Sequence, residues 1–339
     1  MKSKALAFIV PAIAAALAFS CTTRSSFVPP GSYSNVVLVT ESGQPGGANN
    51  AIIRVLQHTL DYYSKNETQF KLRMVSAHDF RDEPPTKNMV IYGVVREGRI
   101  GSIIESFIGT NSVRKVLQGQ NQIFKKIDYP VKGQLTVIVT ASSRDRLARV
   151  TRESGELIRD IIEDANRERL RGSLYTTEKE QAAAELKARY GFSIRIPGEY
   201  AVNQDRGDVP GVEILRDYPV RGITISWLSW PKRELTPADS LALYDFRSEI
   251  VWELHDREVM RPGLVSYGMD EFGPYSAVRM DGYWESSEDL YGGPFVCFFV
   301  HDRVRGRIWM VDCLVYAPGF DKHILLREAI AVAETFRVN

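Results

Sequence analysis

The sequence predicts an α+β protein: an N-terminal α/β layer domain, a long helical connector, and a C-terminal antiparallel sheet with two packing helices. Strand and helix patterns alternate over residues 35–141, apolar residues recur at helical spacing over 142–190, and consecutive strands dominate 191–339. Alternation of this kind is typical of α/β layers, whereas strands joined by short turns form antiparallel sheets. A length of 339 residues is ample for two domains.

The first twenty residues are typical of a signal peptide. Lys2 and Lys4 precede an apolar run over residues 5–19 that only Pro11 interrupts. As a helix this run would span roughly 23 Å at 1.5 Å per residue, less than the ~30 Å hydrocarbon core of a bilayer. We therefore expect residues 1–20 to be removed rather than to span a membrane.

The segment Leu17-Ala-Phe-Ser-Cys21 resembles a bacterial lipobox, with Ala18 where the usual leucine stands. The resemblance implies that Cys21 is lipidated and that residues 21–34 form a tether, while an ordinary secreted protein is the alternative. Thr22 follows the cysteine in place of aspartate, and the tether is not acidic. By resemblance to bacterial sorting rules, we expect a lipid anchor in the outer membrane with the folded part facing the periplasm.

The segments after the tether are predicted in chain order. In the N-terminal domain, apolar and β-branched runs predict strands at residues 35–40, 70–76, 89–95 and 135–141. Helical spacing predicts helices at residues 51–63, 100–108 and 113–118. In the connector, Ser142 or Ser143 can cap a helix, and Gly172-Ser173 with a capping box at 177–180 predicts a second helix ending at Gly191.

The C-terminal domain is predicted as strands with two helices. Strands are expected at residues 192–197, 212–216, 222–230, 265–267, 276–284, 295–301 and 307–316. Thr236-Pro-Ala-Asp239 is a helix start, so one helix should run from there to about His255. A closing helix is expected at residues 321–336.

Several of these segments carry a family resemblance. They are Glu168-Arg-Leu170, Gly191-Phe-Ser-Ile-Arg-Ile-Pro197, Met280-Asp-Gly-Tyr-Trp284, Tyr291-Gly-Gly-Pro-Phe-Val296 and Val315-Tyr-Ala-Pro-Gly319. With the lipobox, they resemble an uncharacterised lipoprotein family of the Bacteroidota, catalogued as domain of unknown function 4837, over essentially the whole chain. The resemblance implies a bacterial envelope lipoprotein of no known activity. The C-terminal half also resembles the Mog1/PsbP fold loosely, in strand order.

Cys297 and Cys313 lie on two strands around the turn 303–307. A three-residue hairpin loop at 304–306 would place the two cysteines opposite each other, near the Cβ separation that a disulfide needs. A register shift of one residue would leave two buried free thiols instead. Both interpretations are open from the sequence.

Other candidate sites carry weaker signals. Trp227, Trp230, Trp284 and Tyr291 could form an aromatic surface for a glycan or a peptide, although aromatic residues at strand spacing usually belong to the core. The loop 41–50 follows a first strand, where phosphate-binding loops occur, but it lacks a phosphate-binding motif. The five histidines show no metal-ligand spacing, so we expect no metal and no cofactor.

Two function classes fit the sequence. With 43 basic and 42 acidic side chains, the near-zero charge argues against a nucleic-acid binder. No catalytic motif is recognisable, which favours a non-catalytic binding or assembly protein anchored to the membrane through Cys21, with an envelope protein or glycan as partner. The alternative is an envelope hydrolase whose site is assembled from residues scattered along the chain.

Overall fold

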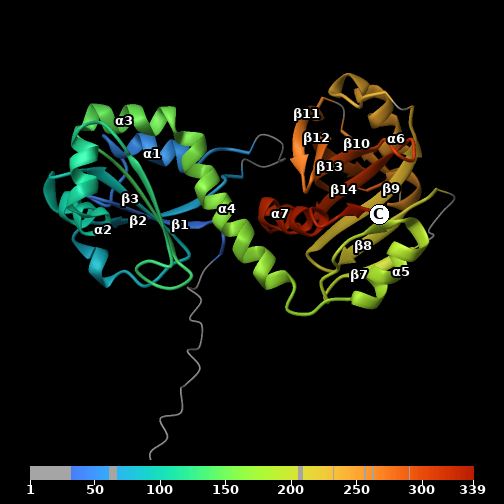
Figure 1. Cartoon of the computed structure of the whole chain (residues 1–339), viewed down its shortest axis with the longest axis horizontal. Coiled ribbons are helices and arrows are strands. Elements are labelled where there is room, and N and C mark those ends of the chain that lie inside the picture. The colour runs from blue at the N-terminus through green and yellow to red at the C-terminus, as the bar shows by residue number, and fades with distance from the viewer. Residues whose placement is uncertain are drawn as a thin grey trace, which may run out of the picture.

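The computed structural model describes residues 32–60, 67–204, 209–231, 233–255, 257–261, 263–289 and 291–339. Two domains lie side by side, and helix α4 runs from one to the other (Figure 1). No helix in these ranges combines the length and apolar character needed to cross a membrane. The predicted signal peptide and Cys21 lie outside the described residues. The predicted α+β fold class is confirmed, with a largely parallel sheet in the first domain and an antiparallel sheet in the second.

The N-terminal domain is built on a five-stranded sheet. In chain order its strands are β1 (Asn35–Thr40), β2 (Lys71–Ser76), β3 (Asn88–Val94), β4 (Ile123–Ile127) and β5 (Leu135–Ala141). The spatial order is β2-β1-β3-β5-β4, and all pairs are parallel except the hairpin of β4 with β5. Every residue of β3 and β5 is buried, because helices cover both faces of the sheet.

Helices form the outer layers of this domain. They are α1 (Asn49–Leu56), α2 (Gly98–Leu117), α3 (Arg144–Glu153) and α4 (Gly155–Leu174), with a short 3₁₀ turn η1 (Asp79–Asp82). One apolar cluster lies under α1, α3 and α4, and another lies under α2. Leu147, Ile158 and Ile162 belong to the first cluster, so α3 and the start of α4 complete this core as well as leading to the second domain.

Two predicted helices have different bounds in the structure. α2 covers both predicted helices because the chain continues through Gly109, where φ is +75° and the helix is kinked. The helix predicted at 51–63 ends at Leu56, since Thr59 then pairs with Thr68 in an isolated antiparallel bridge.

In the connector, Ser143 caps α3 as expected, but the predicted capping box at Thr177 does not form. α5 (Glu180–Tyr190) begins after Lys179, and no side chain caps its first turn.

The C-terminal domain is built on an eight-stranded antiparallel sheet. Its strands are β7 (Ala201–Gln204), β8 (Val212–Arg216), β9 (Val220–Ser229), β10 (Glu258–Met260), β11 (Ser266–Phe272), β12 (Tyr275–Ser286), β13 (Gly292–Asp302) and β14 (Arg307–Tyr316). The order is β10-β12-β13-β14-β9-β8-β7, with β11 also paired to β12. The predicted strand 192–197 forms only β6 (Phe192–Ser193), which pairs with β15 (Arg337–Val338) away from the main sheet.

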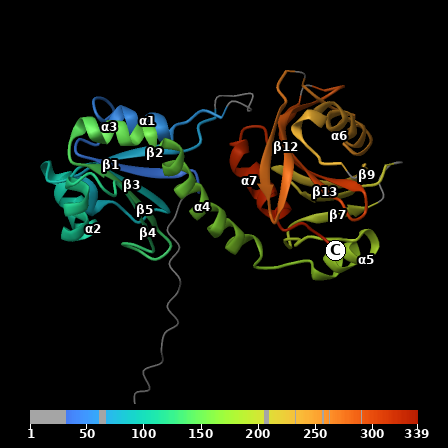
Figure 2. The same ribbon diagram turned by 45° about the horizontal axis from the view of Figure 1, so that its top comes forward.

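Helices again cover both faces. α5 (Glu180–Tyr190) and α7 (Lys322–Ala333) lie over one face, whereas α6 (Ser240–Leu254), preceded by the 3₁₀ turn η2 (Pro237–Asp239), lies over the other. η2 begins at the predicted helix start, where Thr236 and Asp239 form a capping box. Figure 2 shows the two helix layers and α7 beside α4 at the boundary between the domains.

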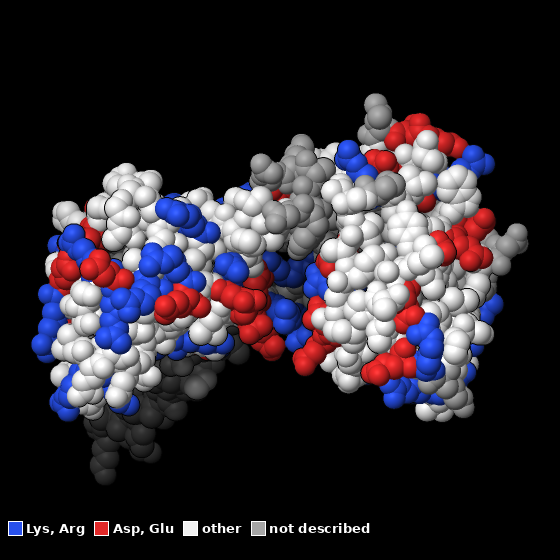
Figure 3. All heavy atoms as spheres, turned by 90° about the horizontal axis from the view of Figure 1, so that it is seen from above, with Lys and Arg blue, Asp and Glu red and all other residues white. Residues whose placement is uncertain are grey.

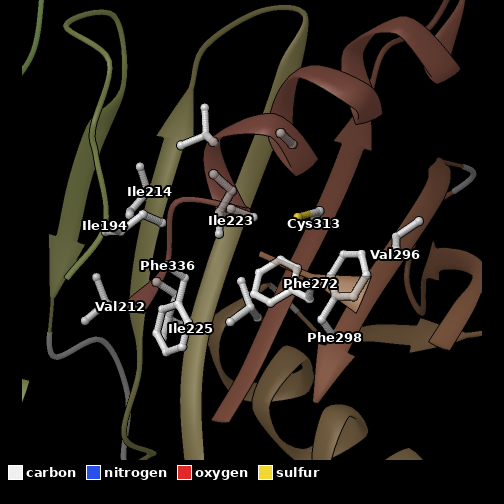
Figure 4. Close-up of a cluster of buried hydrophobic side chains, with 14 of the residues drawn as sticks. Ile194, Val212, Ile214, Ile223, Ile225, Phe272, Val296, Phe298, Cys313 and Phe336 are labelled. Atoms are coloured by element: carbon white, nitrogen blue, oxygen red, sulfur yellow. The ribbon is translucent and has the colours of Figure 1, made fainter. Parts of the chain in front are cut away.

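Of the two interpretations open for Cys297 and Cys313, the structure has the free thiols, because the hairpin register differs by one residue from that of a three-residue loop. Asp302 pairs with Arg307, so Cys297 lies opposite Asp312 and Cys313 lies opposite Val296. The two thiols therefore point to opposite faces of the sheet. Cys313 enters the cluster of Figure 4, near Ile223 and Phe272, while Cys297 belongs to the cluster under α6. Both cysteines are free and fully buried, and burial raises the pKa of each thiol well above its usual value.

A candidate ligand site at the carboxyl edge of the N-terminal sheet

An open cavity of about 300 Å³ lies where β1 and β3 end. The connection after β1 crosses to β2 on one side, whereas the connection after β3 runs through α2 to β4 on the other. Ligands of doubly wound sheets bind at this switch point, where the loops after adjacent strands diverge. The cavity is lined by residues from three separate segments: Glu41, Ser42, Gly46, Ala48, Asn49, Tyr92, Gly93, Val94, Glu97, Ile100, Arg144 and Leu147.

Hydrogen bonds hold the loop after β1 in place. The Thr40 hydroxyl accepts a hydrogen bond from the Gly43 amide at 3.0 Å, and the Asn49 side chain donates to the Gln44 carbonyl at 2.8 Å. At Gly43 φ is +66°, and a Cβ there would lie 2.4 Å from the Ser76 amide nitrogen. The loop 41–48 is therefore fixed by its own side chains and by a glycine that no other residue can replace.

The Glu41 side chain lies against the N-terminus of α2. Its carboxylate accepts hydrogen bonds from the amides of Arg99 at 3.2 Å and Ile100 at 2.7 Å. The N-terminus of a helix is where anionic ligands bind in proteins of this architecture. Because a side chain of the protein already fills that position in α2, the cavity has no free anion site there.

The remaining polar groups of the cavity are the phenol of Tyr92 and an ion pair of Arg144 with Glu97. The Tyr92 hydroxyl donates to the Ala48 carbonyl at 3.2 Å and accepts a hydrogen bond from Thr151 at 3.3 Å. Burial raises the pKa of Tyr92, which keeps it protonated. At the rim, the Arg144 guanidinium donates to the Glu97 carboxylate at 2.6 Å. Two carboxylates and one guanidinium leave the lining with a net negative charge.

A second, larger cleft of about 550 Å³ lies between the domains. Its walls carry charged side chains of both signs, and Figure 3 shows them facing each other where the domains meet. Arg327 of α7 donates to Glu163 of α4 at 2.6 Å, and Arg171 of α4 donates to Glu334 at 2.7 Å. These pairs join the domains across the cleft.

Ser34, His323 and Glu67 form a hydrogen-bonded chain beside that cleft. The Ser34 hydroxyl lies 3.0 Å from Nε2 of His323, and Nδ1 of His323 lies 3.2 Å from the Glu67 carboxylate. Glu67 also accepts hydrogen bonds from the amides of Lys322 and His323 at the start of α7. Burial alone would raise the pKa of Glu67, but these hydrogen bonds outweigh it and lower the pKa. Ser34 is fully buried and His323 is 4% exposed.

A buried charged network lies under α6. The Arg247 guanidinium donates to Asp312 and to Glu258 at 2.9 Å, and all three side chains are almost completely buried. His255 lies 3.2 Å from Glu258 and 3.3 Å from Glu213. Burial would lower the pKa of His255, but hydrogen bonds to Glu213 and Glu258 raise it to about 9.

The aromatic residues predicted as a ligand surface do not share one face. Trp227 packs against Tyr190 and Trp309 on the α5 side, with ring centroids 5.5 and 5.3 Å apart. Trp230, Trp284 and Tyr291 belong to the cluster on the α6 side. Since the sheet separates these groups, the four residues form no common platform.

Of the residues that line the cavity, the sequence pointed only to those in the loop 41–50. The position of loop 41–50 after a first strand was the available signal, whereas Tyr92 and Arg144 lie far along the chain. Ser34 and His323 are 289 positions apart, and no local pattern connects them. Among the described residues, no group of three or more His, Cys, Asp and Glu side chains could hold a metal ion.

The fold and the cavity define a two-domain α+β protein with an open ligand-sized site on its N-terminal sheet. Residues 257–335 match the family profile of DUF4837, a domain of unknown function. The match lies in the C-terminal domain and includes the predicted family segments 280–284, 291–296 and 315–319, so the resemblance is confirmed there. Segments 168–170 and 191–197 lie outside it.

Known structures give distant matches only. A protein of Bacteroides thetaiotaomicron VPI-5482 is 11% identical with a TM-score of 0.28, covering 44% of this chain and 45% of that one. The chain thus spans less than half of that protein. LpqN of Mycobacterium tuberculosis, described as involved in cell envelope biogenesis, is 12% identical with a TM-score of 0.28, covering 43% of this chain and 81% of LpqN. No curated protein matches the sequence.

Proposed function

We propose that this protein is a lipid-anchored envelope protein that faces the periplasm and binds a small ligand without transforming it. The signal-peptide pattern and the lipobox support the anchor at Cys21. The observation that carries the binding role is the formed cavity at the switch point of the N-terminal sheet.

The lining restricts the chemistry of the ligand. Glu41 fills the anion position at α2, and Glu97 adds a second carboxylate that Arg144 balances. A phosphorylated ligand would meet this negative charge without a free helix N-terminus at α2 to neutralise it. A neutral or positively charged polar molecule fits, with the Tyr92, Ile100 and Leu147 side chains as the less polar part of the lining.

Saturation-transfer NMR with ethanolamine, glycerol and glycerol phosphate tests this proposal on the full chain. We expect signals from the first two probes and not from glycerol phosphate. Ala48→Trp places an indole in the cavity from an exposed loop position and should abolish the signals. Ala201→Trp, at an exposed position of edge strand β7, should leave them unchanged. Signals that survive Ala48→Trp would overturn the assignment of the site.

The anchor is tested separately by labelling growing cells with a radioactive fatty acid. The wild-type chain should carry the label and Cys21→Ser should not. Label on Cys21→Ser, or none on the wild type, would contradict lipidation without bearing on the cavity.

A second candidate function is a serine hydrolase, because Ser34, His323 and Glu67 have the hydrogen-bond order of a catalytic triad. Ser34 is completely buried, and Glu67 already accepts a hydrogen bond from a backbone amide at the start of α7. Both features favour a structural role for these residues. A fluorophosphonate probe separates the two interpretations. Labelling that Ser34→Ala abolishes would establish the hydrolase.

A further inference from the structure

The amino edge of the N-terminal sheet is where the tether joins the folded part. β1 begins at Asn35, and the described chain starts three residues earlier, at Ser32. The hairpin loop between β4 and β5 lies at the same edge, because β5 runs parallel to β3 and β1 and Ile127 pairs with its first residue, Leu135. Figure 2 shows β4 and β5 at this margin of the domain.

The chain is held firmly where it enters this edge. The Tyr33 carbonyl accepts hydrogen bonds from the side chains of Asn88 at 2.9 Å and Asn166 at 2.8 Å. Arg169 in turn donates to the side-chain oxygens of both asparagines. Because Asn88 and Asn166 are fully buried, the point where the tether begins has a fixed position on the domain.

The hairpin at this edge exposes apolar groups. Ile127 is 62% exposed at the end of β4, and Tyr129 is 42% exposed in the loop that follows. The Tyr129 ring packs edge-on against Phe107 of α2, with centroids 5.2 Å apart, so its orientation is set by the fold. An aliphatic side chain beside a partly exposed tyrosine is typical of segments that lie in the interface of a bilayer.

Lysines surround these two side chains. Lys125 and Lys132 are exposed, and Lys126 lies over the Tyr129 ring with its ammonium 5.7 Å from the centroid. The acidic residue of the loop is Asp128, whose carboxylate accepts a hydrogen bond from the Gly133 amide at 2.7 Å. Three lysines against one carboxylate give the hairpin a positive charge that complements anionic lipid headgroups.

We propose that this surface, Lys125, Lys126, Ile127, Tyr129 and Lys132, docks on anionic phospholipid headgroups of the membrane that holds the anchor. The docking surface rests on the proposed lipidation of Cys21. Ser32 lies eleven positions after Cys21, so the tether reaches at most about 36–40 Å when fully extended. A connection of this length that starts at this edge lets the hairpin at the same edge reach the headgroups.

A fluorescent probe in reconstituted vesicles tests the docking surface. The full lipidated chain carries Ile127→Cys labelled with an environment-sensitive dye, and Leu241→Cys, 74% exposed in the other domain, is the matched control. The native Cys297 and Cys313 are fully buried and should stay unlabelled. Vesicles of phosphatidylcholine alone are compared with vesicles containing an equal part of phosphatidylglycerol.

We expect a blue shift of the dye at position 127 with phosphatidylglycerol, reversed by high salt, and no shift at position 241. The double reversal Lys125→Glu with Lys132→Glu should abolish the shift, while Lys115→Glu, exposed on α2, should not. A water-like spectrum at position 127 on chains that float with the vesicles would overturn docking and leave the anchor intact. Chains that fail to float would contradict the anchor instead.

Discussion

The two domains use charge in different ways. In the N-terminal domain the clusters on both faces of the sheet are apolar, and the polar side chains of the site lie at the carboxyl ends of the strands and in the segments that follow them. In the C-terminal domain a charged network of Arg247, Asp312, Glu258 and His255 lies inside one face of the sheet. Parallel strands all point the same way, so the loops that follow them gather at one edge, that of the carboxyl ends. An antiparallel sheet distributes its loops over both edges.

This difference assigns ligand binding to one domain and charge-dependent stability to the other. Candidate binding functions belong to the strand ends of the first domain, where substitutions change loops and leave the core intact. The stability of the second domain depends on charges inside it, so it should fall as the pH rises. All five tryptophans, Trp227, Trp230, Trp252, Trp284 and Trp309, lie in the C-terminal domain, so their fluorescence reports its unfolding separately.

Arg247→Ala should have the largest effect. It leaves Asp312 and Glu258 buried without their partner, which costs about 3–5 kcal/mol in the free energy of unfolding. Urea titration followed by tryptophan fluorescence measures it. Arg171→Ala removes a half-exposed pair with Glu334 and should cost no more than about 1 kcal/mol. Equal losses in the two variants would show that the network contributes no more than a surface ion pair.

Raising the pH should weaken the C-terminal domain next most strongly. The pKa of His255 is about 9 in the folded state, against about 6.5 for an unperturbed histidine. A raised folded pKa gives stability that is complete below about pH 6.5 and lost as the pH rises through 9, up to about 3 kcal/mol. The tryptophan-detected urea midpoint should fall over this range. A slope that persists in His255→Gln would assign the pH dependence to another group.

Glu67→Gln should loosen the contact between the domains. The variant weakens the hydrogen bonds to His323 and to the start of α7, at about 1–2 kcal/mol. The pKa of Glu67 is lowered, so this contribution is present above about pH 4.5 and lost as the pH falls through the folded value. Calorimetry should resolve two transitions where the wild type shows one. Glu156→Gln, exposed on α4, is the control, and two transitions there would contradict the role of Glu67.

The smallest expected effect concerns the thiols. Cys297 and Cys313 face opposite sides of the sheet, so a reducing agent should leave the melting temperature unchanged. Thiol titration of the unreduced chain lipidated at Cys21 should find no reactive group when folded and two after unfolding. Loss of those two thiols without reductant would contradict the register described above.

The central strands could be predicted because both of their faces are buried, as in β3 and β5. The missed strands are edges: β4, β7 and β10 have three to five residues, and polar side chains interrupt their apolar pattern. The sequence left the disulfide and the free thiols both open, because a change of one residue in the loop length moves every side chain of a strand to the other face.

The candidate site was less predictable for a different reason. Its loop follows β1, and that position could be identified from the chain order alone. Tyr92, Arg144 and Leu147 arrive from later segments through the strand order β1-β3-β5, which no local pattern encodes. The same holds for Ser34 with His323, which only the packing of one domain on the other brings together.

The direction of the N-terminal sheet has an electrostatic consequence. Strand β3 spans seven residues, or about 20 Å, between the lysine-bearing hairpin edge and the cavity at the opposite edge. At physiological ionic strength the field of a charged surface decays over a Debye length of about 8 Å. With the hairpin on the bilayer, the cavity lies more than two such lengths away, so its affinity for a charged ligand should not depend on the lipid composition.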